Sequence, residues 1–190
     1  MRILGIDPGL ATIGIGLVEA SSPREVRALD WLTIETQAGA PAQERLAEIH
    51  RDLRAYVREA RPERAVVEKL FFATNERTAL DVAQARGIIL LTLAEEEIPT
   101  LEPTPLELKA AITGDGGADK RQMQDMLKIL LHLQDIPKPD DAADALALAV
   151  FGALQPNHLQ QFSAGRHPAR PRPGQALGNK RTATVNARQT

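Results

Sequence analysis

The chain of 190 residues is 43% hydrophobic and 25% charged, a composition typical of one globular domain with a buried core. It contains no cysteine, which excludes disulfides, thiolate zinc sites, iron–sulfur clusters and a thiol nucleophile. The formal net charge of −2 is unevenly distributed. Residues 157–190 hold six basic residues and no acidic one, whereas residues 1–156 hold 25 acidic and 17 basic residues, a charge of −8.

The two ends of the chain give further limits. The amino terminus lacks the apolar run of a signal peptide, and no stretch approaches the roughly 20 apolar residues of a membrane span, so we expect a cytoplasmic protein without a membrane partner. Residues 157–190 are rich in proline, glycine and basic residues and show no apolar periodicity, which predicts a disordered tail after a domain of residues 1–156. This tail either only solubilises the protein or contacts an acidic polymer nonspecifically.

The first half of the domain reads as strands followed by a helix. Apolar residues 2–6 and 12–18 flank the turn-forming pair Pro8-Gly9, which predicts a hairpin, and residues 26–34 read as a third strand. Apolar residues at helical spacing predict an amphipathic helix from Pro41 to Ala60. Residues 65–68 then form a short buried strand.

The second half alternates helices and strands. The sequence predicts a helix over 75–95, a strand over 99–101, and helices over 105–112 and 119–132. A final helix from Asp140 is apolar nearly all round, which indicates that it is buried against the sheet. This order predicts an α/β fold, a mixed sheet flanked by helices.

Two carboxylates close apolar strands. Asp7 ends the first strand, and Glu68 ends the strand that begins at Ala65. Ligands often bind at the strand ends of α/β sheets, so both are candidates for chemistry. The alternatives are an Asp7 side chain that caps the following turn and a Glu68 that pairs with Lys69 or a nearby arginine.

Asp141 and Asp144 are three residues apart at the start of the last helix, so their side chains share one face. They could chelate a cation, or they could cap the helix and complement its dipole. If the four carboxylates converge, they form an all-oxygen site suited to Mg²⁺ or Mn²⁺, and a pair of such ions catalyses phosphoryl transfer.

Four motifs carry a family resemblance: ILGIDPGLATIGIGLV, VVEKLFFATNERTALDVAQARG, LKAAITGDGGADKRQMQDMLKILL and DDAADALALAV. In order, spacing and content they resemble the RuvC family of Holliday junction resolvases over nearly all of residues 1–154. The resemblance implies an RNase H-like fold with a mixed five-stranded sheet flanked by helices. It also implies a homodimer that nicks two like-polarity strands of four-way junction DNA with Mg²⁺, two ions per active site, and that works with a RuvA–RuvB branch-migration complex.

The same resemblance assigns roles to single residues. Asp7, Glu68, Asp141 and Asp144 fall on the family's catalytic, metal-binding carboxylates, and an activated water would leave a 5′-phosphate and a 3′-hydroxyl. Lys120 matches a lysine near the active site, where it could steady the phosphate, and it could equally be a solvated lysine. Gly114 begins a glycine-rich stretch that could approach a phosphate or serve as a linker.

Other positions are candidates for DNA contact. Lys109 matches a family lysine expected at the DNA backbone. The resemblance places Phe71 at the junction, where an aromatic face can stack on an unpaired base, whereas its neighbour Phe72 could belong to the core. Three flanking residues could touch phosphates or be solvated helix residues: Asn75, Arg77 and Arg86. Two departures from the family are Pro103, where relatives often have an aromatic residue, and the additional acid Asp140.

Three other functions compete with the resolvase. The first hairpin also resembles the phosphate loop of the actin, Hsp70 and sugar-kinase ATPases, but a chain of 190 residues has no room for their second lobe. A related RNA-processing nuclease and a catalytically silent junction-binding module are the others. The four acids disfavour the silent module because a concentrated negative pocket repels phosphate.

Overall fold

A computed structural model describes residues 1–69 and 76–155. Five strands form one sheet in the order β3-β2-β1-β4-β5. The strands are β1 (Arg2–Asp7), β2 (Thr12–Ser22), β3 (Glu25–Glu35), β4 (Arg64–Val67) and β5 (Thr100–Leu101). The helices are α1 (Ala42–Ala60), α2 (Glu76–Glu95), α3 (Pro105–Thr113), α4 (Lys120–Leu131) and α5 (Asp140–Leu154).

The sheet is mixed, as the sequence predicted. β1, β2 and β3 form an antiparallel meander, whereas β4 runs parallel to β1 and β5 runs parallel to β4. The register places Asp7 opposite Gly14 and aligns Ile6 with Val67. The predicted elements are confirmed, and their ends differ from the expectation by a few residues, as at β2, which continues to Ser22.

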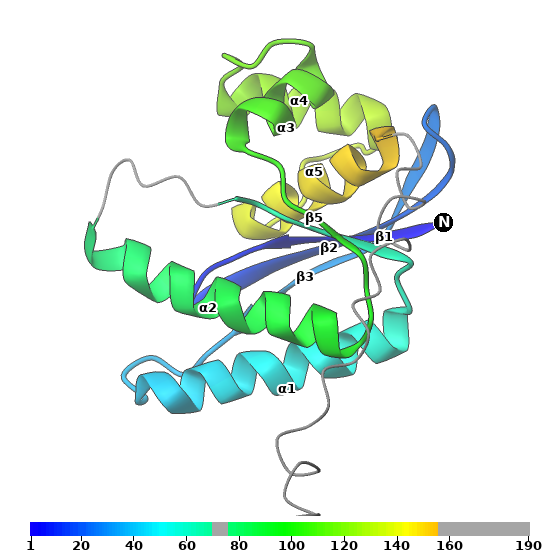
Figure 1. Ribbon diagram of the computed structural model, residues 1–190. Coiled ribbons are helices and arrows are strands. Elements are labelled where there is room, and N and C mark those ends of the chain that lie inside the picture. The colour runs from blue at the N-terminus through cyan, green and yellow to red at the C-terminus, as the bar shows by residue number, and fades with distance from the viewer. Residues whose placement is uncertain (70–75, 156–190) are drawn as a thin grey trace, which may run out of the picture. The chain divides into compact units, whose positions relative to one another are not determined.

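Helices cover both faces of the sheet (Figure 1). α1 and α2 lie on one face, and α5 crosses the other face with α3 and α4 packed beyond it. Because side chains alternate along a strand, neighbours in β1 enter different layers. Ile3 belongs to the core under α5, and Leu4 and Ile6 belong to the core under α1 and α2.

α5 lies unusually close to the sheet because glycines face it. A Cβ atom on Gly5 would lie 1.9 Å from the carbonyl oxygen of Ala145, and one on Gly16 would lie 2.5 Å from the nitrogen of Leu146. These two glycines are paired across β1 and β2. The absence of side chains there lets the helix backbone contact the strand backbones, and nearly every residue from Ala142 to Ala153 is buried.

Local signals define the helix ends. α1 stops where Arg61 adopts a left-handed conformation, with a φ of 50°, and Pro62 follows. Thr104 and Asp119 form capping boxes at the starts of α3 and α4, each reciprocated by the third residue of the helix. None of the helices in the described ranges is both long and apolar enough to cross a membrane.

The close contact between α5 and the sheet predicts that one methyl group added at Gly5 strongly lowers the stability of the fold. Gly5→Ala should destabilise the fold by about 1–3 kcal/mol or more, because the new Cβ must displace the α5 backbone. Urea denaturation measures the free energy of unfolding. Gly87→Ala in α2 is the matched control, since nothing in the same chain lies within 4 Å of its added Cβ. At protein concentrations low enough to give monomer, it should be neutral or stabilising by up to about 1 kcal/mol. Equal stabilities of the two variants would contradict this account of the packing.

Candidate active site

The parallel pair β1 and β4 delivers two carboxylates to one edge of the sheet. Since Ile6 is aligned with Val67, the next residues, Asp7 and Glu68, leave their strands side by side. Asp7 follows Ile3 and Gly5 on the face that α5 covers. Both side chains are partly buried and line the same pocket.

α5 brings its first turn to the same edge. A Cβ atom on Gly14 would lie 2.0 Å from the carbonyl oxygen of Asp141 and 3.2 Å from the Cβ of Asp7. The start of α5 therefore rests on the strand residue that is paired with Asp7. Asp144 follows one turn later and lines the pocket together with Asp7.

The electrostatics show that these acids share one neighbourhood. The pKa of Asp7 is raised to about 7, first by burial and then by the negative charges of Asp144, Glu68 and Asp141. Lys120 acts in the opposite direction on the same group. A strand-end aspartate with such a pKa is a candidate for a functional site, because crowded carboxylates repel one another and do not stabilise the fold.

Glu68 and Asp144 are perturbed in the same sense. Burial and the charge of Asp144 raise the pKa of Glu68, and Lys109 lowers it. Burial also raises the pKa of Asp144, although half of its side chain reaches solvent, and Lys120 opposes that shift. Within the described ranges, neither Asp7 nor Glu68 has a side-chain ion pair, so the expected alternative of a Glu68–Lys69 pair is not found there.

Lys120 lies at the mouth of the acidic cluster. Its Nζ donates to Oδ2 of Asp140 at 2.9 Å and lies 3.6 Å from Oδ2 of Asp144. The hydrogen bond to Asp140 is the main reason that the pKa of Lys120 is raised. The fifth acid noted in the sequence therefore has a partner, and Lys120 is an ion-paired lysine beside the candidate site.

One pocket, with a volume of about 230 Å³, contains this site. Asp7, Glu68 and Asp144 line it together with Lys109 and Lys120, and apolar side chains of α3, α4 and α5 complete the wall. Sequence analysis missed one polar lining residue, Gln124. It lies four residues after Lys120, so the helical spacing of α4 could have identified it once Lys120 was placed.

No group of three or more acidic or histidine side chains in residues 1–69 and 76–155 is arranged as ligands around a common point. Asp7, Glu68 and Asp144 share the pocket, whereas Asp141 does not line it and acts on Asp7 through its charge. The four carboxylates therefore do not surround a common point. Their chemistry nevertheless fits a hard divalent cation, because all four donors are carboxylates and like charges are crowded at Asp7. Binding an ion there requires the side chains to close around it.

The remaining candidates have different outcomes. Phe71, Phe72 and Asn75 lie outside the described residues, and for Arg77 only the main chain, in the first turn of α2, is described. Arg86 contacts the main chain of Glu68.

The glycine-rich stretch after α3 has the contacts of a linker. Gly114 caps α3 in a left-handed conformation, and the N–H of Gly117 donates to Asp115. Pro103 stands where relatives often have an aromatic residue. Its carbonyl oxygen accepts a hydrogen bond from the N–H of Lys69 at 2.8 Å, which joins the chain after β4 to the chain after β5.

Comparison with known proteins decides the family. The family model described as crossover junction endodeoxyribonuclease RuvC matches residues 3–152. The chain belongs to this family. A RuvC of Chloroflexus aurantiacus is 51% identical over 162 residues, which cover 85% of this chain and 98% of that protein. The RuvC of Thermomicrobium roseum is 48% identical over 165 residues, 86% of this chain and 100% of that protein.

Solved structures of RuvC and of a related resolvase agree with the fold. The structure of T. thermophilus RuvC in complex with a Holliday junction substrate has a TM-score of 0.76 and 33% identity, and the match covers 81% of this chain and 93% of that chain. The yeast mitochondrial resolvase Ydc2 has a TM-score of 0.60 at 15% identity, covering 78% and 76% of the two chains, which is a likeness of fold alone. The predicted RNase H-like fold is thereby confirmed.

The raised pKa of Asp7 predicts a pH-dependent stability. Between about pH 4 and 7 the folded chain retains a proton on Asp7 that the unfolded chain releases, so stability falls as the pH rises through this window. Asp7→Asn should therefore be more stable than the wild type at pH 8, by about 1–3 kcal/mol, and the difference should vanish towards pH 4. Urea denaturation across this range tests it, with Asp135→Asn, an exposed acid in another loop, as the control. A difference that is independent of pH would contradict the crowding of charge at Asp7.

Proposed function

We propose that this chain is a metal-dependent endonuclease that resolves four-way DNA junctions by paired, symmetric nicks. The observation that carries the proposal is the convergence of Asp7, Glu68 and Asp144 on one pocket, where burial, and then the charges of the acidic neighbours, raise the pKa of Asp7. Membership of the RuvC family supports it, as does the likeness to a RuvC whose structure holds a Holliday junction substrate.

The carboxylates of Asp7, Glu68, Asp141 and Asp144 would hold the divalent ions, Mg²⁺ or alternatively Mn²⁺, two per active site. When bound, such ions stabilise the attacking and leaving oxygens of a phosphodiester and lower the pKa of a bound water. The crowding of like charge favours this role, because a cation offsets the repulsion that, after burial, raises the pKa of Asp7.

The lysines of the pocket supply the positive charge that a phosphate needs. Lys120, from α4, lies close enough to the acids to lower the pKa of Asp7 and Asp144, and Lys109, from α3, lowers that of Glu68. We assign Lys120 to the scissile phosphate and its developing charge, and Lys109 to the adjoining DNA backbone. Hydrolysis adds water across the bond between phosphorus and the 3′ oxygen, which leaves a 5′-phosphate and a 3′-hydroxyl.

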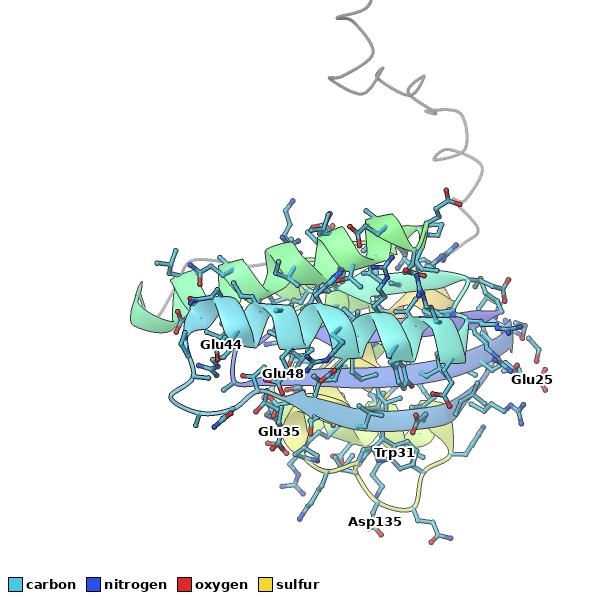
Figure 2. The ribbon with its side chains drawn as sticks, turned by 90° about the horizontal axis from the view of Figure 1, so that it is seen from below. Glu25, Trp31, Glu35, Glu44, Glu48 and Asp135 are labelled. Atoms are coloured by element: carbon cyan, nitrogen blue, oxygen red, sulfur yellow. The ribbon has the colours of Figure 1, made fainter. Side chains whose placement is uncertain are left out.

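Charge also limits where the DNA can lie. Glu35, Glu44 and Glu48 lie near the end of β3 and the start of α1, and Figure 2 shows the three close to one another. Phosphates would be repelled there. The junction would instead approach from the face that carries α3 and α4, where Lys109 and Lys120 line the pocket.

Several expectations from the sequence and from the resemblance remain predictions. They are stacking by Phe71 or Phe72, phosphate contacts of Asn75 and Arg77, the division into a domain of residues 1–156 and a basic tail, and cooperation with a RuvA–RuvB complex. We also propose a cytoplasmic location.

Removing a ligand should abolish cleavage and spare binding. Asp7→Asn and Glu68→Gln should each lower the cleavage rate of a synthetic four-way junction in Mg²⁺ by at least about 100-fold, while the junction Kd in Ca²⁺ changes little. The reason is that each substitution removes a metal ligand and little DNA-contacting surface. Denaturing gels measure the nicks, and gel shifts measure the binding.

The control is Asp135→Asn, which should cleave at the wild-type rate. Near wild-type cleavage by Asp7→Asn would refute its role. Wild-type protein that binds junctions without cutting them would favour the silent module, turnover of ATP would favour the ATPase reading, and preferential cutting of RNA would favour the RNA-processing nuclease.

We further propose that the active form is a homodimer joined through α2. Two nicks at symmetric positions require two active sites, and each chain carries one such pocket within its described residues. On α2, Leu80 and Leu91 are 65% and 50% exposed, and eleven residues place them on the same helix face, turned away from the core. A second copy of the same helix would cover both leucines.

The dimer can be tested by placing a charge on that face of α2. Leu91→Glu should shift the protein from dimer to monomer in sedimentation equilibrium, because burying an unpaired carboxylate is costly. On a supercoiled plasmid with an extruded cruciform, it should yield nicked circles where the wild type yields linear product. Ile129→Glu, at a residue of α4 that is 64% exposed, is the matched control. A dimeric Leu91→Glu would exclude this interface.

A further inference from the structure

Arg86 of α2 has contacts that none of the sequence readings anticipated. Its Nε donates to the main-chain oxygen of Glu68 at 3.0 Å, and its guanidinium forms an ion pair with the carboxylate of Glu102. Its side chain is 17% exposed, compared with 60% for Arg58 in another ion pair of the same fold. Arg86 is therefore not a solvated helix residue, and its guanidinium is already bonded within the fold, so it would have to break these contacts to bind a phosphate.

The contact lies where the sheet ends. The last paired residues of β4 and β5 are Val66 and Leu101, so the main chain of Glu68 lies beyond the ladder. Two hydrogen bonds hold the chain there, one from the N–H of Lys69 to the carbonyl of Pro103 and one from Arg86 to the carbonyl of Glu68. Glu102 in turn orients the guanidinium.

We infer that Arg86 is a positioning residue for Glu68: it fixes the strand end from which that carboxylate reaches the active site. The inference rests on the proposed function, in which Glu68 is a metal ligand. Arg86 bonds to the main chain and not to the carboxylate, whose charged neighbours are Asp144 and Lys109. Its action is therefore one of geometry, comparable to that of the outer partners that orient metal ligands.

The two partners explain why an arginine stands here. A guanidinium presents several N–H groups in a rigid fork and can serve a carbonyl and a carboxylate at once. A lysine ammonium on a flexible stem keeps the charge but cannot reproduce the fork. A glutamine keeps neither the charge nor the reach.

The test compares Arg86→Gln and Arg86→Lys with the wild type on a synthetic junction. Arg86→Gln should lower kcat by about 10–100-fold and weaken Mn²⁺ binding in calorimetry by about tenfold, the range expected when an outer partner of a metal ligand is lost. Arg86→Lys should fall between the two. The junction Kd in Ca²⁺ and its salt dependence should change less than threefold, whereas a phosphate contact would change both and leave kcat intact.

Two further variants keep the result interpretable. Glu102→Gln removes the ion pair that orients the guanidinium but keeps the hydrogen bond from Arg86 to Glu68. It should therefore lower kcat and Mn²⁺ affinity less than Arg86→Gln does. The double variant should lose no more of either than Arg86→Gln alone. Glu102→Gln also replaces Arg86→Gln if that variant does not fold. Arg58→Gln, which breaks the ion pair between α1 and Glu96, the residue after α2, is the control and should leave kcat and Mn²⁺ binding unchanged.

Two outcomes separate the inference from the proposed function. If the wild type cleaves junctions and folded Arg86→Gln keeps both kcat and Mn²⁺ affinity within twofold, Arg86 does not position Glu68 and the inference is wrong. If the wild type does not cleave junctions at all, the proposed function is wrong, and the Mn²⁺ titration still reports whether Arg86 shapes the acidic site.

Discussion

The contact between the backbone of α5 and the backbones of β1 and β2 is the constraint on which this structure depends. Gly5, Gly14 and Gly16 leave no room for a side chain under the helix. A larger residue at any of them would lift α5 and carry Asp141 and Asp144 away from Asp7. The glycines that let α5 pack on the sheet are therefore also required to bring the acidic residues together.

The acids are held together by apolar burial and not by attraction. α5 is apolar and buried over most of its length, and this burial stabilises a packing that places its acidic first turn beside Asp7 and Glu68. Burial first, and the repulsion of its acidic neighbours second, raise the pKa of Asp7. Lys120 relieves only part of this repulsion from the mouth of the pocket, which is consistent with a site that is completed by cations from solution.

α2 links the features that a junction-cutting dimer needs. Its inner face packs in the core under the sheet, Arg86 reaches from it to the end of β4, and Leu80 and Leu91 point away from the core. α2 therefore both helps to position Glu68, through Arg86, and carries the surface, with Leu80 and Leu91, proposed to contact a second copy.

The sequence by itself determined the elements and the identity of the candidate acids. Periodicity and turn residues identified every strand and helix, and Asp7 and Glu68 were recognisable because a charge that ends an apolar strand is conspicuous. Tertiary structure alone decided which residues meet. The opposition of Asp7 and Gly14 and the reach of Arg86 to Glu68 join positions from different elements, and no local pattern encodes them. The glycines under α5 act through a missing side chain, which leaves no hydrophobic or charge signal until the helix is seen lying on them.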